Sequence, residues 1–175
     1  MEIGGGFGAN AHLLMHMFPN IKKYLYLDIP PNLYVGTQYL KYFFPKAVVD
    51  YKVTAGLERI EFKNNDDREI LAIAPWQIEK VKVTVDGVWN SHSFVEMPLA
   101  TIQNYKKYIK QFIRKQPSSF LCMLTYDGFN LSSTIHPHKL VEVFESFLNI
   151  EEIQPCINLQ EIKKRKPFYY YGKPI

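Results

Sequence analysis

The sequence predicts an α/β fold: an open, mainly parallel sheet with helices on both faces and a closing antiparallel strand. Two observations support this prediction. Apolar runs of strand length alternate along the chain with segments of helical periodicity, which is the pattern of a parallel sheet with crossover helices. The 175 residues are 47% hydrophobic and 15% aromatic, which is enough for one packed domain over 1–175.

The first half of the chain predicts strands separated by two helices. Apolar residues at helical spacing occupy 9–18 and 32–44, and Pro19 ends the first of these segments. A β-rich strand at 24–27 ends on Asp28, because the prolines that follow take the chain out of the sheet. The strands of this half are expected at 1–3, 24–27 and 68–74, with a weaker one at 47–53.

The second half repeats the alternation and finishes with two strands. The apolar run at 118–127 is nearly continuous, as is typical of a strand that is buried on both faces. The long helix has an apolar stripe that should face inward, formed by Leu99, Ile102, Tyr105, Ile109 and Phe112. Strands are expected at 83–94, 118–127, 150–159 and 168–172, and helices at 97–115 and 138–149.

The charge of the chain indicates no nucleic-acid partner. Its 21 basic and 17 acidic residues give a formal net charge of only +4. The basic run at 163–167 could hold an anionic polymer or a lipid headgroup, but we interpret it as a solvated connection to the strand that follows. Because there is no leader sequence and no run of about 18 apolar residues, we expect a cytoplasmic protein without a membrane span.

Cysteine and histidine placement predicts no metal site. Cys122 and Cys156 lie in apolar stretches without a CxxC pattern, so we interpret them as core thiols. His136 and His138 could supply half of a metal site, but a turn that caps a helix accounts for them better. Two further features are interpreted as a helix face and a solvated loop, namely His12 with His16 and the acidic segment at 64–69.

Four glycines follow the first predicted strand, at Gly4, Gly5, Gly6 and Gly8. The turn after the first strand of such a sheet is the usual site of a nucleotide-like ligand, and glycine lets the ligand approach the backbone closely. Asp28 ends the second strand, where a carboxylate can accept hydrogen bonds from both hydroxyls of a ribose. The turn fits both G-x-G-x-G and the dinucleotide pattern G-x-G-x-x-A, so it indicates an adenosine-containing ligand without deciding which one.

Three segments are more specific when they are read together. They are the acidic-hydrophobic-glycine motif from Glu2 to Gly8, the segment Asp28-Ile29-Pro30, and an N-x-x-S-x-x-E-M segment with Asn90, Ser93, Glu96 and Met97. This combination resembles the class I S-adenosylmethionine-dependent methyltransferases, most closely the sugar O-methyltransferase family, over nearly the whole chain. The resemblance implies a Rossmann-like methyltransferase fold, S-adenosylmethionine as the cofactor, and methyl transfer to a small-molecule or glycan acceptor through a sugar hydroxyl.

The resemblance also implies which residues bind the cofactor. Glu2 and the glycine turn would hold the methionyl part and the ribose side, Asp28 would accept the ribose hydroxyls, and Ile29 would pack beside the adenine. Trp76 could cover the adenine ring or could equally be an apolar anchor of the fold. Gln77 could bond the edge of the ring.

Residues near the end of the fourth predicted strand are the candidates for the chemistry. The resemblance implies that oxygen atoms of Asn90 and Ser91 lie beside the sulfonium. A sugar hydroxyl needs a general base, and His92 is the first candidate because the ordinary pKa of histidine, about 6.5, suits that task. The family commonly has another residue there, so the resemblance carries no role for His92. Glu96 is the second candidate, with a helix-start carboxylate as its structural interpretation.

The start of the chain departs from the family. Only three residues precede the glycines, whereas a buried strand usually spans about five or six, so we expect a truncated first strand and a missing N-terminal segment. Two other functions stay open, the first because the glycine turn also fits the dinucleotide pattern and the second because of the short first strand. One is an NAD(P)-dependent oxidoreductase, although Tyr105, Lys106 and Lys107 lack the Tyr-x-x-x-Lys spacing. The other is a non-catalytic domain that binds the cofactor or a partner.

Overall fold

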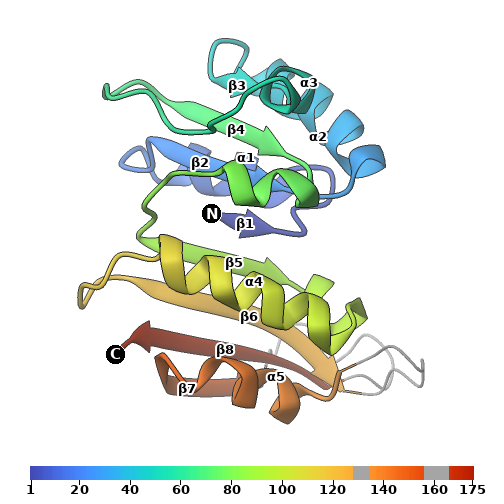
Figure 1. Ribbon diagram of the computed structural model, residues 1–175, viewed down its shortest axis with the longest axis vertical. Helices are drawn as coiled ribbons and strands as arrows, with labels where there is room; N and C mark the ends of the chain where they lie inside the picture. The colour runs from blue at the N-terminus through green and yellow to red at the C-terminus, as the bar shows by residue number, and fades with distance from the viewer. Residues whose placement is uncertain (128–134, 156–165) are drawn as a thin grey trace. The chain divides into compact units, whose positions relative to one another are not determined.

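The structure is a computed structural model that describes residues 1–127, 135–155 and 166–175 (Figure 1). Within these ranges the chain forms two compact units, Met1–Val83 and Thr84–Ile175, each with its own strands and helices. The expectation of a single domain stays a prediction. No helix within the described ranges is long and apolar enough to cross a membrane.

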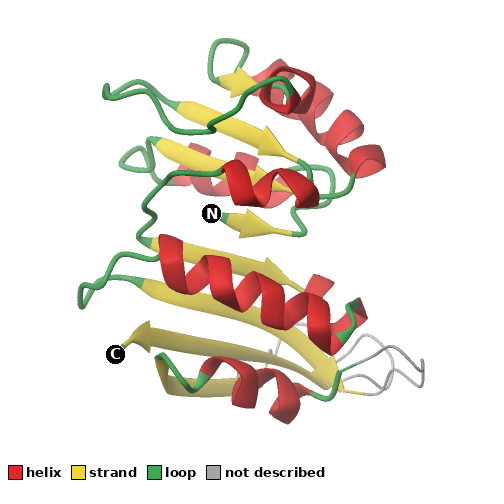
Figure 2. Ribbon diagram, in the orientation of Figure 1, coloured by secondary structure: helices red, strands yellow, loops and turns green. Residues whose placement is uncertain are grey.

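The first unit has four parallel strands in the order β3-β4-β2-β1. These strands are β1 (Glu2–Ile3), β2 (Lys23–Leu27), β3 (Val48–Val49) and β4 (Glu69–Ile73). The helical segments are α1 (Ala9–Met17), α2 (Pro30–Phe43), α3 (Tyr51–Ala55) and the 3-10 turn η1 (Pro75–Lys80) (Figure 2). The strand, turn and helix expected over 1–18 and the strand that ends before Asp28 are confirmed.

The central strand β2 is covered on both faces. Its two tyrosines belong to a buried cluster with residues of α1, α2 and β4, among them Ala11, Met15, Leu33, Leu40 and Ile70. Leu25 and Leu27 alternate with the tyrosines and therefore face the other side of the sheet, where they are equally buried. This packing fixes the carboxyl end of β2, where Asp28 follows.

Two details of the first unit differ from the expectations. The weak strand expected at 47–53 is only two residues long, because the Asp50 side chain accepts a backbone hydrogen bond from the first turn of α3 and starts a helix there. Glu69 was expected in the solvated loop at 64–69. It is instead the buried first residue of β4, where it forms a 3.3 Å salt bridge with Lys23.

The second unit contains the strand order β5-β6-β8-β7, with β5 and β6 parallel and β8 antiparallel to both of its neighbours. The strands are β5 (Gly87–Ser91), β6 (Phe120–Asp127), β7 (Leu148–Pro155) and β8 (Lys166–Pro174). The helical segments are η2 (Ser93–Glu96), α4 (Leu99–Phe112) and α5 (Pro137–Phe144). The closing antiparallel pair is confirmed. Cys156 and most of the basic run at 163–167 lie outside the described residues.

Aromatic rings form part of the core of the second unit. The Phe94 ring in η2 lies 6.0 Å from the Tyr105 ring of α4 and 5.8 Å from the Phe144 ring of α5, measured between centroids. Four residues of the predicted inward stripe of α4 are buried, namely Ile102, Tyr105, Ile109 and Phe112. The prediction for Leu99 was wrong. This side chain is 38% exposed because Leu99 is the first residue of the helix, before the packed turns begin.

Candidate functional site

The glycine turn connects β1 to α1 in a left-handed backbone conformation. The φ angle is 75° at Gly4, 56° at Gly6 and 91° at Gly8. A residue with a Cβ rarely adopts such angles, so the glycines are needed for this path of the chain. The backbone N–H of Gly4 donates to the carbonyl of Leu27 over 2.8 Å, which anchors the turn to the end of β2.

Gly6 is held at both ends of its backbone by residues of the β2 segment. Its N–H donates to Oδ2 of Asp28 over 2.6 Å. Its carbonyl accepts a hydrogen bond from the hydroxyl of Tyr26. The structure therefore brings together the two features that the sequence analysis selected as the ribose site, the glycine turn and Asp28.

Asp28 is 7% exposed and its carboxylate direction is set by three donors. Besides Gly6, the backbone N–H of Ile29 donates to Oδ1 over 2.7 Å and Nδ2 of Asn32 donates to the same atom over 2.9 Å. An ionised carboxylate offers about four acceptor positions. The group can therefore accept a further hydroxyl donor without giving up its place in the fold.

Glu2 lies beneath the glycine turn and is fully buried. Its carboxylate accepts hydrogen bonds from the Tyr24 hydroxyl over 2.9 Å and from Nδ2 of Asn10 over 3.0 Å. Burial raises the pKa of Glu2, although these two hydrogen bonds oppose the shift. Glu2 thus joins β1, β2 and α1 under the turn, in addition to any contact with a ligand.

Two apolar side chains at the carboxyl ends of the strands of the first unit remain exposed. Ile29, directly after Asp28, is 53% exposed, and Trp76, in the first turn of η1, is 64% exposed. The interpretation of Trp76 as an apolar anchor of the fold was wrong, since an anchor would be buried. Both side chains are available to pack against a flat ligand.

Gln77 is buried and its amide is used inside the fold. Its Oε1 accepts a hydrogen bond from the backbone N–H of Ala74 over 2.7 Å, and its Nε2 donates to Oγ1 of Thr54 over 3.1 Å. The side chain is 2% exposed. Because both ends of the amide have partners, we leave Gln77 out of the adenine contact that the sequence suggested.

In the second unit, Asn90 and Ser91 end β5 and organise the turn that follows. Asn90 is 1% exposed. Its Nδ2 donates to the Ser93 hydroxyl, and its Oδ1 accepts a bond from the backbone N–H of Phe94 over 3.2 Å. The Ser91 hydroxyl accepts a bond from the indole N–H of Trp89 over 2.8 Å. Both side chains therefore have well-defined orientations at the carboxyl end of the strand.

His92 has a strained backbone. Its φ angle of 66° makes it the one non-glycine residue with positive φ in the part of the chain that the structure describes. The backbone N–H of His92 donates to the carbonyl of Leu124 over 2.8 Å, which pins the strained residue to β6. Such strain persists where surrounding structure enforces it and is frequent at functional sites. Glu96 is exposed and lies in the first turn of the short helix η2, which agrees with its structural interpretation as a helix-start carboxylate.

The other histidines and the first cysteine have structural positions. His136 caps α5, and its Nδ1 accepts a bond from the backbone N–H of His138, as expected. The His12 ring stacks on Phe43 with 3.8 Å between centroids, in the aromatic contact of α1 with α2. Cys122 is buried, and burial raises the pKa of its thiol to about 11. Among the described residues no three His, Cys, Asp or Glu side chains form a group that could hold a metal.

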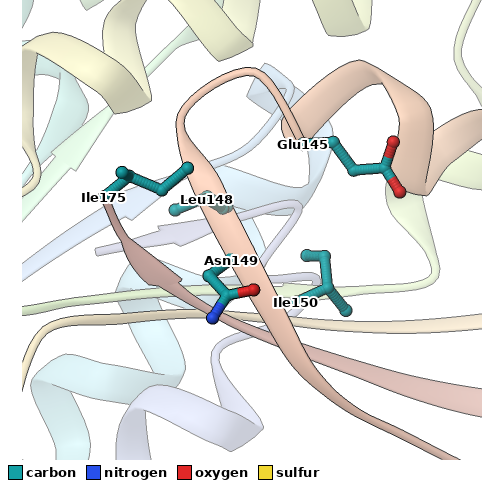
Figure 3. A pocket seen from close by; sticks show the side chains of 5 residues that line it. All are labelled: Glu145, Leu148, Asn149, Ile150 and Ile175. Carbon is teal, nitrogen blue, oxygen red and sulfur yellow. The ribbon is translucent and has the colours of Figure 1, made fainter.

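An open depression in the second unit is separate from these residues. It is lined by Glu145, Leu148, Asn149, Ile150 and Ile175 (Figure 3). The figure shows the side chains of β7 and the end of the chain at its border. None of the predicted site residues lines it, so it is no part of the candidate site.

Several solved structures have a similar fold. The PH0226 protein from Pyrococcus horikoshii OT3 matches 99% of this chain and 80% of its own, with a TM-score of 0.68 and 11% identity. The mitomycin 7-O-methyltransferase MmcR matches with a TM-score of 0.64 and 15% identity, and LepI in complex with SAM with 0.61 and 11%. Both matches cover 99% of this chain, but only 48% of MmcR and 42% of LepI.

These likenesses show the fold. The chain has the Rossmann-like methyltransferase fold, a mainly parallel sheet with helices, as the sequence predicted. No protein-family model matches the chain, and no curated protein sequence matches it. At identities of 11–15% the likeness carries no substrate to this chain.

The sequence analysis missed the residues that support the turn. Tyr24, Tyr26, Asn10 and Asn32 all form hydrogen bonds with the glycine turn, Glu2 or Asp28. The alternation of tyrosine and leucine in β2, directly before Asp28, was an available signal. It places both tyrosines on one face of the strand.

Proposed function

We propose that this protein is an S-adenosylmethionine-dependent methyltransferase that acts on a sugar hydroxyl of a small-molecule or glycan acceptor. One observation carries the proposal: the hydrogen bond of Gly6 to Asp28, which places an oriented carboxylate beside a glycine turn on the methyltransferase fold. This is the arrangement that a ribose diol next to a close backbone approach requires. The choice of a sugar hydroxyl as the methyl acceptor rests on the resemblance to the sugar O-methyltransferase family, which includes the N-x-x-S-x-x-E-M segment.

The residues of the first unit bind the nucleoside side of the cofactor. Asp28 accepts a ribose hydroxyl in addition to its three present donors, and the glycine turn holds the methionyl part, with Glu2 buried beneath the turn as its support. Ile29 and Trp76 pack against the adenine. Their exposed fractions of 53% and 64% support this role, because such large apolar surfaces gain from being covered.

The roles proposed for residues of the second unit rest on the sequence and its resemblance alone. Bound S-adenosylmethionine supplies a methyl group on a positively charged sulfur. By the resemblance, the Ser91 hydroxyl oxygen would face that charge, while the buried Asn90, whose amide is bonded to the turn that follows, would hold the end of β5 in place. His92 would accept the proton of the acceptor hydroxyl as the hydroxyl oxygen bonds to the methyl carbon, the methyl–sulfur bond breaks and S-adenosylhomocysteine leaves. Glu96 is the second candidate for this base. The strained backbone of His92 supports its choice over Glu96.

Replacement of the carboxylate tests the proposed ribose site. We expect Asp28→Ala to raise the Kd of S-adenosylhomocysteine about 10- to 100-fold, because a hydrogen bond to a charged group is lost. Asp66→Ala, in an exposed loop of the same unit, is the matched control and should leave the Kd unchanged. Unchanged binding in Asp28→Ala, with wild-type binding intact, would remove the ribose assignment.

A further inference from the structure

Tyr26 occupies a closed space between the glycine turn and α2. The side chain is fully buried, and its single O–H is shared between the carbonyl of Gly6 and the carbonyl of Asn32, the latter over 3.3 Å. One phenol therefore links β2, the turn after β1 and the first turn of α2. Tyr26 does not belong to any of the three segments that carry the resemblance.

Two glycines provide the space for this ring. A Cβ on Gly5 would lie 2.4 Å from Cε2 of Tyr26, and a Cβ on Gly36 would lie 2.1 Å from its hydroxyl oxygen. Both distances are well below the 3.0 Å that Cβ atoms keep from neighbouring heavy atoms, so an alanine at either position would clash with Tyr26. Gly36 lies inside α2, where glycine is disfavoured, so the presence of the tyrosine hydroxyl accounts for it.

The peptide groups of Gly6 are consequently fixed on both sides. Asp28 accepts from its N–H, and Tyr26 donates to its carbonyl. Burial raises the pKa of Tyr26, and the nearby carboxylates of Asp28 and Glu2 raise it further. The phenol therefore stays protonated and remains a donor at neutral pH.

We infer that Tyr26 is a positioning residue, which holds the Gly6 backbone and thereby keeps the turn and the Asp28 carboxylate in their ligand-binding geometry before the ligand arrives. A site that is ordered in advance loses less entropy on binding, so it binds more tightly with the same contacts. The inference rests on the proposed function for the identity of the ligand. It deepens that function by adding a residue that does not touch the ligand.

The test removes only the hydroxyl. Tyr26→Phe should raise the Kd of S-adenosylhomocysteine about three- to tenfold, the factor expected for one lost hydrogen bond, and should speed amide hydrogen exchange at Gly6 and Gly8 without ligand. The matched control is Tyr39→Phe, which removes a hydroxyl that lies 2.7 Å from Nδ1 of His12 rather than on the turn. It should change neither quantity. Both variants are compared at a temperature at which circular dichroism shows them fully folded.

The outcomes separate this inference from the proposed function. Wild-type binding together with an unchanged Kd and unchanged exchange in Tyr26→Phe overturns the inference alone. Equal losses in Tyr26→Phe and Tyr39→Phe also overturn it, since they indicate a general loosening of the unit. Absence of wild-type binding to S-adenosylhomocysteine contradicts the proposed function, and the inference about its site falls with it.

Discussion

Gly6 and Asp28, 22 residues apart in the chain, are joined by a 2.6 Å hydrogen bond from the backbone N–H to Oδ2. The bond ties the turn after β1 to the end of β2, the two places where this fold receives a nucleotide-like group. Since Asp28 also accepts from Ile29 and Asn32, its carboxylate is already oriented. A ribose would meet an acceptor that needs no rearrangement.

Removal of the exposed indole should weaken cofactor binding without loss of stability. Trp76→Ala is expected to raise the Kd of S-adenosylhomocysteine about tenfold, the usual scale for an aromatic side chain that packs on a base. Its unfolding free energy should change by less than about 0.5 kcal/mol, because the side chain is 64% exposed. Calorimetric titration and urea unfolding measure the two quantities. A large loss of stability with normal binding would return Trp76 to a structural role.

The neighbouring residue should behave in the opposite way. Gln77→Ala is expected to lower the unfolding free energy by about 1–3 kcal/mol, since the backbone N–H of Ala74 and the hydroxyl of Thr54 lose a buried partner. The Kd for the cofactor should stay within about twofold of wild type at a temperature where the variant is folded. Lost affinity in a fully folded Gln77→Ala protein would restore the adenine contact.

Glu2 should make stability depend on pH. Its pKa is raised above the ordinary value of 4.5 by burial, so the folded state binds a proton more readily than the unfolded state. The stability that this group contributes is complete below pH 4.5 and is lost as the pH rises through the raised pKa. Glu2→Gln, which keeps a neutral acceptor for Tyr24, should therefore gain stability relative to wild type as the pH rises above 4.5. Urea unfolding measures the unfolding free energy of both proteins at each pH. A difference between them that stays constant with pH would contradict the expectation.

The strain at His92 should be measurable by substitution. His92→Gly is expected to be about 0.5–1 kcal/mol more stable than His92→Ala, because a φ angle of 66° is costly for alanine and ordinary for glycine. Both variants should bind S-adenosylhomocysteine as wild type does, since His92 is proposed to act on the acceptor. Urea unfolding compares the variants. Equal stability of the two would show that the backbone is not strained at this position.

Gly36 and Tyr26 should be coupled. Gly36→Ala is expected to destabilise the protein by about 1–3 kcal/mol, because its Cβ meets the Tyr26 hydroxyl oxygen. In the Tyr26→Phe background that oxygen is gone and the nearest ring atom lies 2.9 Å away, so the cost of Gly36→Ala should fall by about 1 kcal/mol. A double-mutant cycle by denaturant unfolding gives this coupling directly. Strictly additive effects would mean that the alanine clashes with something else.

The sequence analysis identified the elements well where local patterns decide them. The period of the apolar residues and the prolines located α1, β2 and α2, and the continuous apolar run located β6. It placed Asp28 beside the glycine turn, since both features follow adjacent strands at the same edge of a parallel sheet. Local patterns failed at Asp50, where a single side-chain cap turned an expected strand into α3.

The features of the candidate site that could not be predicted depend on contacts between residues that are distant in the sequence. Trp76 and Gln77 are neighbours in the sequence, yet Trp76 is exposed and Gln77 is buried and bonded to Thr54. Which of the two faces inward depends on the backbone path of η1. The role of Tyr26 likewise requires the position of Gly36 on α2. The left-handed backbone of His92 could not be predicted from the residue type, because even histidine adopts a positive φ only rarely.

The binding of S-adenosylhomocysteine by the wild-type chain tests the central claim most directly. We would titrate the purified protein by calorimetry with S-adenosylmethionine, S-adenosylhomocysteine and NADH in parallel. The account predicts binding of the first two and none of NADH. Binding of NADH without the other two would contradict it, and would assign the glycine turn and Asp28 to a dinucleotide instead.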